Sequence, residues 1–294
     1  ESKLSPNTDF TSHGLRYKFC NECSHLNGAH EDTKSFIEDM YITDEGSDYS
    51  NYYIDDGFVK RSEDIYIPKL DFLTESLGRN DYTILDVGCG SGHFVHAAFH
   101  RGIHAKGLDV SKSMVAFGNN QISHNIGVTP LEYADEIGFY EAIVNSSQDV
   151  ISAIGVIEHL REPQRFFDAF QKSNADYLYY SVPMFSNTVF FEFMNQDVFP
   201  RQLSGGHTHL FVEDSIQKMN SLIGVEPIGE WRFGTDMMDM FRIMMNRFNQ
   251  SEVSDRFIDF FDQGFKKNID PLQSVFDQNH FCSEIHLVAK KLPK

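Results

Sequence analysis

Residues that could hold a nucleoside-bearing cofactor lie close together near position 90. Residues 84–94 read ILDVGCGSGHF, which predicts a buried strand, a glycine-rich turn and a helix. A second predicted strand, residues 105–109, ends in Asp109, 21 residues after Gly88. At this spacing a βαβ unit presents an acid to the hydroxyls of a ribose. The sequence therefore predicts a site for a cofactor that carries a nucleoside.

Details of the glycine turn select among such cofactors. A dinucleotide site has the pattern G-x-G-x-x-G, but His93 takes the place of the third glycine here, and no lysine follows as in a P-loop. Asp86, just before the turn, would repel a phosphate but would suit an ammonium group. S-adenosylmethionine (SAM) has an ammonium group and no phosphate, and its carboxylate can approach the N–H groups that glycines leave uncovered. The turn therefore favours SAM over NAD.

The motif D-x-G-x-G-x-G at residues 86–92, with an acid at the end of the next strand, resembles the class I SAM-dependent methyltransferases. Later motifs resemble a group of that family that includes enzymes of ubiquinone biosynthesis and enzymes that modify surface sugars. These motifs are residues 156–160 with Pro163, residues 181–183, and residues 209–216 with 223–224. The resemblance covers roughly residues 80–230 and the last predicted strand.

The resemblance implies which residues contact the cofactor. They are Asp86, Gly88, Cys89 and Gly90 in the turn at the methionine end, Asp109 at the ribose, Val110 and Met114 beside the adenine, and Ala153, Ile154 and Gly155 beneath the sulfonium. Cys89 is interpreted as a small filler of the turn rather than a reactive thiol, because the turn needs slim residues. For Met114, packing within its helix is an equal alternative.

Methyl transfer to an oxygen with a high pKa needs a base, and histidine titrates in the useful range. His159 and its neighbour Glu158 follow the predicted strand 149–154, at the edge where ligands bind in open α/β sheets. His159 is therefore a candidate base. In the alternative interpretation the pair starts a helix, where the helix dipole favours a glutamate.

Two further clusters are candidates for the acceptor site. His207 and His209 follow a pair of glycines, and alternation in an extended segment would point only one of them at a substrate. Either histidine could instead cap the next helix. Asp236, Asp239 and Arg242 could bind a hydroxylated or phosphorylated acceptor, or they could form a solvated helix face.

Metal sites are predicted from cysteine and glutamate spacing. Cys20 and Cys23, within residues 17–25, resemble the second half of the N-terminal zinc ribbon of some sugar methyltransferases, whose first cysteine pair would lie upstream of Glu1. A bare cysteine pair is the alternative. The small-RNA 3′-end methyltransferases hold a divalent metal with Glu-x-x-Glu-His, but Gly155 replaces the first glutamate here. No active-site magnesium is therefore predicted, and an RNA substrate is disfavoured.

Charge and composition narrow the expected partners. The chain of 294 residues has a net charge of −18, which disfavours nucleic acid and anionic membranes as partners. No apolar run approaches the length that spans a bilayer, and four cysteines predict a reducing, cytoplasmic setting without a disulfide framework. The oligomeric state is not predicted.

The expected fold is α/β: a doubly wound, Rossmann-like, seven-stranded methyltransferase sheet with helical cap insertions. Residues 1–60 are expected to form an N-terminal cap or partial zinc ribbon, and residues 61–294 the SAM-binding domain. Residues 184–206 are predicted to be an irregular insertion, and residues 235–280 a helical one. The strands are predicted near 83–87, 105–109, 128–131, 149–154, 177–182, 227–231 and 283–290, and the helices at 64–77, 93–100, from 111, 163–173 and 208–224.

The sequence thus predicts a SAM-dependent methyltransferase. The favoured reaction is O-methylation of a small polar acceptor, such as a sugar, nucleotide sugar or glycan precursor, on analogy with the resembling enzymes. C- or N-methylation of a small molecule is the alternative reaction. A SAM-binding regulatory scaffold without catalysis is the alternative class.

Overall fold

The structure, a computed structural model, describes residues 4–12, 15–28, 57–160, 162–198, 200–203, 207 and 209–293. The chain divides into two compact units. The first consists of Glu1–His30, Val182–Lys218 and Trp231–Ile285, and the second of Glu31–Ser181, Met219–Glu230 and His286–Lys294. Both predicted insertions belong to the first unit, and all the predicted cofactor residues belong to the second.

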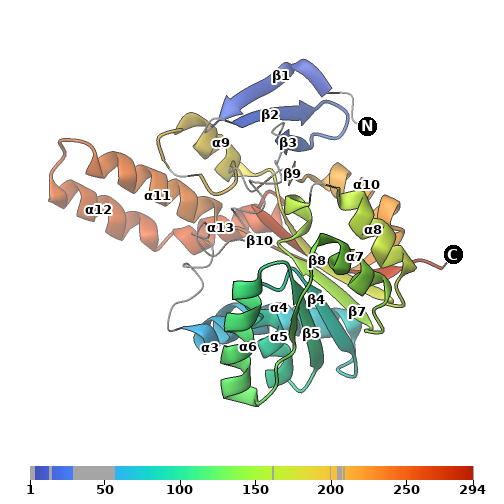
Figure 1. The fold of residues 1–294 in the computed structure, drawn as a ribbon. Coiled ribbons are helices and arrows are strands. Elements are labelled where there is room, and N and C mark those ends of the chain that lie inside the picture. Colours follow the sequence, from blue (N-terminus) through green and yellow to red (C-terminus); the bar gives the residue numbers. More distant parts are fainter. Residues whose placement is uncertain are drawn as a thin grey trace. The chain divides into compact units, whose positions relative to one another are not determined.

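A seven-stranded sheet is the centre of the second unit (Figure 1). Its strands are β4 (Thr83–Val87), β5 (His104–Asp109), β6 (Leu131–Tyr133), β7 (Val150–Ile154), β8 (Tyr177–Pro183), β10 (Val225–Phe233) and β11 (Glu284–Lys291). They are arranged in the order β10-β11-β8-β7-β4-β5-β6. The pairs β4–β5, β4–β7, β5–β6 and β7–β8 are parallel. This topology confirms the predicted doubly wound α/β fold.

The chain order of the strands reverses between β4 and β7. In open α/β sheets, ligands bind outside the carboxyl ends of the strands at such a reversal. A ligand site is therefore expected among the residues that follow β4, β5 and β7.

Helices flank this sheet, and most follow the predicted segments. They are α3 (Phe58–Arg61), the π-helix η2 (Ser62–Tyr66), α4 (Ile67–Leu77), α5 (His93–His100), α6 (Lys112–Ile126), α7 (Glu136–Val144), the short η3 (Ile157–His159), α8 (Pro163–Lys172) and α10 (Glu213–Ile223). The Ser111 hydroxyl accepts the N–H of Met114 and caps α6 at its N-terminus. Among the described residues, no helix has the length and apolar character needed to cross a bilayer.

The core of the second unit is formed largely by apolar residues of its central strands and flanking helices. Ile84 of β4 and Val150 of β7 are completely buried, as is usual for parallel strands covered on both faces. Leu70 and Leu73 of α4 and Phe94 of α5 belong to the same cluster. This packing fixes the ends of β4 and β7, from which the site residues extend.

The first unit contains a four-stranded sheet that the sequence analysis does not anticipate. Its strands are β1 (Leu4–Ser12), β2 (Leu15–Cys20), β3 (Leu26–Gly28) and β9 (His209–Leu210), in the order β1-β2-β3-β9. Neighbouring strands pair antiparallel. A buried cluster packs with this sheet and consists of Tyr17, Leu26, Val189, Leu203 and Leu210.

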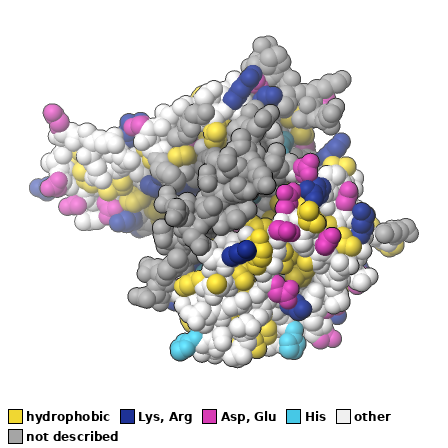
Figure 2. All heavy atoms as spheres, viewed as in Figure 1, with side chains coloured by type: hydrophobic (Ala, Val, Ile, Leu, Met, Phe, Trp, Pro, Cys, Tyr) yellow, Lys and Arg dark blue, Asp and Glu magenta, His cyan; other side chains and the backbone are white. Residues whose placement is uncertain are grey.

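Three helices of the first unit confirm the helical prediction for residues 235–280. They are α11 (Asp236–Asn249), α12 (Asp255–Lys266) and α13 (Ile269–Gln278). The ring of Phe241 stacks on those of Phe261 and Phe265, with centroids 5.8 Å apart in each pair. Figure 2 shows hydrophobic side chains on the surface of α11 and α12 among charged groups of both signs.

Several element predictions are wrong. Residues 184–206 are not irregular throughout, because α9 (Asn187–Met194) forms there. The segment before α10 contains β9, so the helix begins at Glu213 rather than near residue 208, and β6 begins at Leu131 rather than near residue 128. Helix α7 is absent from the prediction. These are short elements, whose stability comes from tertiary packing more than from local sequence pattern.

Candidate cofactor site and catalytic residues

The glycine turn after β4 adopts a backbone that only glycine tolerates easily. Gly88, Gly90 and Gly92 have φ angles of 67°, 53° and 78°. The N–H of Gly88 donates to the carbonyl of Leu108 at 2.8 Å, so the turn is tied to β5. A Cβ on Gly88 would lie 2.6 Å from Cγ2 of Val156, the residue before η3. The turn is thus packed between β5 and the segment that follows β7.

Asp109 ends β5 and joins that strand to the turn. Its two oxygens accept the N–H of Gly90 at 2.7 Å and the N–H of Ser111 at 2.8 Å. Burial raises the pKa of this carboxyl, although the N–H groups of Ser111, Gly90 and Val110 oppose the rise. The carboxylate therefore has a fixed orientation, which suits a group that recognises two hydroxyls of one sugar.

Asp86 is the second buried acid of the site. It is 4% exposed, and the Ser152 hydroxyl donates to it at 2.7 Å from the paired residue of β7. Burial raises the pKa of Asp86 to about 7; the Ser152 hydroxyl opposes this rise, and the Asp109 charge adds to it. A cation beside Asp86 would stabilise its ionised form. The ammonium group of SAM fits this requirement, whereas a phosphate does not.

Cys89 lies within the turn, and Met114 packs against it. The Cys89 sulfur would lie 2.7 Å from a Cβ on Gly107, and burial and the charges of Asp109 and Asp86 raise the pKa of its thiol. This favours the interpretation of Cys89 as a filler, because the reactive form of cysteine is the thiolate. The Met114 methyl group would lie 3.3 Å from a Cβ on Gly90. Met114 therefore contacts the turn in addition to its own helix.

The end of β7 passes from buried to exposed residues. Ala153 is completely buried, Ile154 is half-buried and Gly155 is exposed with a φ of 67°. The N–H of Gly155 donates to the Ser181 hydroxyl at 3.0 Å. Ile154 and Gly155 are thus placed to face a ligand at the sheet edge, while Ala153 can contribute only through its backbone.

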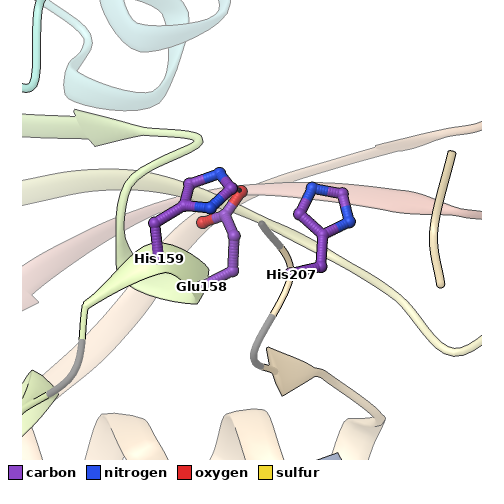
Figure 3. A group of neighbouring side chains, drawn as sticks. All are labelled: Glu158, His159 and His207. Carbon is purple, nitrogen blue, oxygen red and sulfur yellow. Dashed lines mark ion pairs between the residues drawn. The ribbon is translucent and has the colours of Figure 1, made fainter. Parts of the chain in front are cut away.

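Glu158 and His159 form the η3 turn directly after β7. Their side chains lie together, with Oε1 of Glu158 3.8 Å from Nε2 of His159 (Figure 3). The glutamate side chain is 5% exposed and the histidine side chain 20% exposed. A buried carboxylate at this distance stabilises an imidazolium, so the pair can accept and hold a proton.

The other two histidine candidates, His207 and His209, belong to the first unit. Nδ1 of His207 lies 3.1 Å from the carbonyl of Gln202. His209 lies in β9, and its Nδ1 is 3.1 Å from Nε2 of His25. Burial and the charge of His209 lower the pKa of His25 to about 3. The His25 contact makes His209 part of the small sheet.

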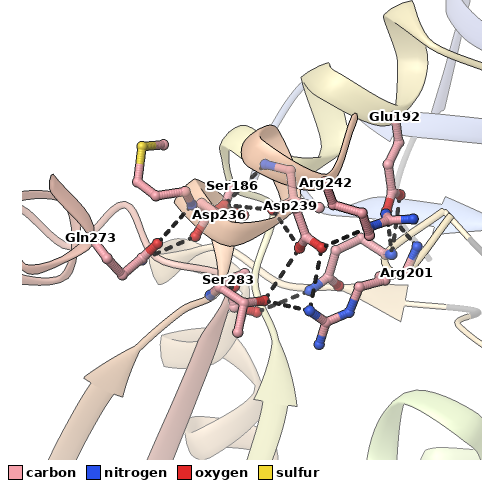
Figure 4. A network of polar contacts seen from close by, with 12 residues as sticks. Ser186, Glu192, Arg201, Asp236, Asp239, Arg242, Gln273 and Ser283 are labelled. Atoms are coloured by element: carbon pink, nitrogen blue, oxygen red, sulfur yellow. Dashed lines mark hydrogen bonds and ion pairs between the residues drawn. The ribbon is translucent and has the colours of Figure 1, made fainter. Parts of the chain in front are cut away.

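Asp236, Asp239 and Arg242 lie at the start of α11, where both carboxylates are completely buried (Figure 4). Asp236 accepts hydrogen bonds from Ser186, Thr188 and Gln273. Asp239 contacts the guanidinium groups of Arg201 at 3.3 Å and Arg242 at 3.5 Å. These acids bind α9, α11 and α13 together. Their role in acceptor binding stays a prediction.

Cys20 and Cys23 lie at the turn between β2 and β3. The N–H of Ser24 donates to the Cys20 carbonyl at 2.8 Å and closes this turn. Burial raises the pKa of the Cys20 thiol, but the N–H groups of Cys23 and Glu22 and the Cys23 thiol together outweigh burial and lower it. N–H groups directed at a sulfur favour its thiolate, which is the form that binds metals.

Part of the chain is similar to a known protein family. Residues 85–176 match the protein-family model described as "Methyltransferase domain". The chain therefore contains a methyltransferase domain. No curated protein matches the chain.

Solved structures of methyltransferases share the fold. Magnesium protoporphyrin IX methyltransferase from Synechocystis PCC 6803, with bound SAH, is 14% identical with a TM-score of 0.57, over 88% of this chain and 100% of that chain. A SAM-dependent methyltransferase from Archaeoglobus fulgidus is 16% identical with a TM-score of 0.50, over 83% and 100%. Phosphoethanolamine N-methyltransferase 2 from Haemonchus contortus, in complex with SAM, is 14% identical with a TM-score of 0.51, over 95% and 62%. At these identities the likeness establishes the fold, and the assignment to the ubiquinone and surface-sugar group stays a prediction.

Sequence reasoning misses three polar residues around the methyltransferase site and the buried network. Ser152 and Ser181 each interrupt an apolar strand, which is the one local signal of a polar partner inside a sheet. Glu192, in α9, bonds to residues 201–203. Nothing in its local sequence distinguishes it from a glutamate on a helix surface.

Proposed function

We propose that this protein transfers the methyl group of SAM to an oxygen of a small polar acceptor, such as a sugar, nucleotide sugar or glycan precursor. The observation that carries the proposal is the buried Glu158 carboxylate beside His159 at the carboxyl end of β7. A methyl acceptor oxygen must lose its proton, and this pair offers a base whose protonated form is stabilised by a neighbouring charge. Some nitrogen and carbon acceptors can be methylated without such a base.

Within this proposal the cofactor is held by the second unit. Asp86 binds its ammonium group, the N–H groups of the glycine turn approach its carboxylate, and Asp109 binds the ribose hydroxyls. Val110 and Met114 flank the adenine, with Ile154 and Gly155 beneath the sulfonium. When bound, SAM supplies an electrophilic methyl group and a good leaving group, a neutral thioether. The protein then has to orient the acceptor and remove its proton.

The chain has three candidate bases, and each can be tested by itself. His159→Ala, His207→Ala and His209→Ala are compared by release of S-adenosylhomocysteine with a panel of sugars, nucleotide sugars, amines and phenols. Loss of a positioned base should lower turnover by about 10²–10⁴-fold while leaving SAM affinity nearly unchanged. We expect this loss for His159 or His207, and a smaller one for His209, which is engaged with His25.

Three results would contradict the proposed reaction. Turnover within a few-fold of the parent in all three variants would show that none of these three histidines acts as the base. SAM binding without turnover on any acceptor of the panel would favour the regulatory scaffold. A preference for amines would favour N-methylation.

Asp236→Asn, Asp239→Asn and Arg242→Gln, assayed for acceptor KM, test whether the buried network contributes to acceptor binding.

We also propose that Cys20 and Cys23 are two ligands of a structural zinc. The support is their C-x-x-C spacing on a closed turn and the N–H groups directed at the Cys20 sulfur. Elemental analysis of the full-length protein should find about one zinc per chain, and Cys20→Ser should lose it. Cys282→Ser is the control, because this buried cysteine donates to the Glu284 carbonyl instead. Absence of zinc from the full-length protein would refute this site.

A further inference from the structure

Glu192 is a buried carboxylate that binds a loop rather than a cation. Glu192 lies in α9 and is 1% exposed. Its carboxylate accepts the N–H groups of three consecutive residues. These are Arg201, Gln202 at 3.1 Å and Leu203 at 2.7 Å (Figure 4). Successive N–H groups that converge on one anion form a nest, and here the anion is supplied by the protein itself. Residues 201–203 are therefore held in one backbone conformation.

Two further contacts anchor the same loop. Leu203 is completely buried in the cluster that packs with the small sheet. The Gln202 side chain donates to the carbonyl of Ser283 at 3.4 Å. With its N–H groups bound to Glu192 and its side chains fixed, the loop also fixes the direction of its carbonyl groups.

The Gln202 carbonyl is directed at His207. Nδ1 of His207 lies 3.1 Å from this oxygen, and a carbonyl oxygen can only accept a hydrogen bond. In the neutral imidazole the proton must therefore lie on Nδ1, which leaves the lone pair on Nε2. That tautomer is the one in which Nε2 can accept a proton from a substrate.

We propose that Glu192 is a positioning residue, which holds His207 as the Nδ1–H tautomer through the backbone of residues 201–203. This inference rests on the proposed function, in which His207 is a candidate base. It names a residue that acts on the base without touching the substrate. The same arrangement, a partner that fixes one imidazole nitrogen so that the other can react, operates in catalytic and metal-binding histidines.

The chemistry of Glu192 suggests a nearly isosteric test. Burial raises the pKa of this carboxyl, while the N–H groups of Leu203, Arg201 and Gln202 oppose the rise. Glu192→Gln keeps the size of the side chain but replaces one acceptor oxygen by an NH₂ group, which cannot accept an N–H. Because both oxygens accept bonds in the parent, the variant must release part of the loop.

The test does not require a known acceptor. Long-range ¹H–¹⁵N spectra at about pH 8 distinguish the two tautomers of a neutral histidine, and His207→Ala identifies the His207 signals. We expect the Nδ1–H tautomer in the parent and a mixture with the Nε2–H tautomer in Glu192→Gln. Glu192→Asp, which keeps the charge on a shorter side chain, should give a smaller shift and replaces the Gln variant if that variant fails to fold. Glu252→Gln, an exposed glutamate of the same unit, should change nothing.

Two spectral results would overturn the proposal: a parent His207 in the Nε2–H form, or an unchanged Nδ1–H form in both Glu192 variants. Turnover provides the second arm once an acceptor is found. Glu192→Gln should lower turnover by about 10- to 100-fold, part of what a positioned base contributes, with SAM affinity unchanged. Added to His207→Ala, it should cause no further loss, whereas additive losses would contradict positioning. If His207→Ala has no effect on turnover, the base assignment fails while the spectra still decide the role of Glu192.

Discussion

The two acids of the cofactor site are buried to a similar extent but are satisfied differently. Asp109 accepts backbone N–H groups on both oxygens, whereas the hydrogen bond found for Asp86 comes from the Ser152 hydroxyl. Burial raises the pKa of both carboxyls, that of Asp86 to about 7. Asp109 is thus an acceptor of fixed orientation, while a cation beside Asp86 would favour its ionised form.

This difference predicts a pH dependence of SAM binding. With a pKa of about 7, Asp86 is mostly protonated at pH 6, and the ammonium group binds its ionised form. Affinity should therefore rise by about 10-fold between pH 6 and pH 8 and level off above the pKa. Calorimetry across this range measures the effect. Asp86→Asn should bind weakly and serves as the control for titration of the ligand. Equal slopes in parent and variant would show that Asp86 is not the titrating group.

At this scale, sequence reasoning identifies the candidate residues that their neighbours in the chain define. The glycine turn and Asp109 are recognisable from spacing alone. Ser152 is not, because its partner Asp86 lies 66 residues away and only the register of β4 and β7 brings the two together. The role proposed for Glu192 could not be predicted from the sequence either, since it depends on how the chain folds back after α9.

At the scale of elements, the site depends on how closely the glycine turn packs against the segment after β7. Strands β4, β5 and β7 are predicted nearly correctly, because β4 and β7 are short, mainly apolar runs bounded by turn residues and β5 follows the predicted helix 93–100. The small sheet is not predicted, because β3 and β9 have three and two residues and give no periodic signal. Helix α9 lacks a side-chain cap that would mark its start.

Packing at the turn predicts the cost of a methyl group at Gly88. Gly88→Ala adds backbone strain at a φ of 67° and a contact of 2.6 Å with Val156. We expect a loss of about 2–4 kcal/mol in the free energy of unfolding, measured by urea denaturation. Gly102→Ala is the matched control, with a φ of 75° and no atom within 4 Å of the added Cβ, and should lose only about 1–2 kcal/mol.

The source of the extra loss can be checked in the same experiment. Adding Val156→Ala removes the γ carbons that the new methyl group would meet, so the double variant should be more stable than the sum of the single changes implies. A Gly88→Ala loss no larger than that of Gly102→Ala would contradict the close packing of the turn against Val156.

At the scale of the whole molecule, the chain combines a part that the family model matches with parts that lie outside that model. The family match, residues 85–176, lies in the second unit and includes all the predicted cofactor contacts. The first unit, with the small sheet, α9 and α11–α13, lies outside it. The cofactor could therefore be predicted from sequence, whereas the acceptor could not, because the motifs that contain the proposed acceptor-site residues do not identify a substrate.

The central claim is that the turn and Asp109 bind SAM, and calorimetry on the intact chain tests it most directly. SAM and S-adenosylhomocysteine should bind, while NAD should not. Asp109→Ala should weaken SAM binding by roughly 10- to 150-fold, because hydrogen bonds to a charged group contribute about 1.5–3 kcal/mol. Asp81→Ala, at a side chain that is 88% exposed, should leave the affinity unchanged. Unchanged SAM affinity in folded Asp109→Ala, or NAD binding as tight as that of SAM, would contradict the account.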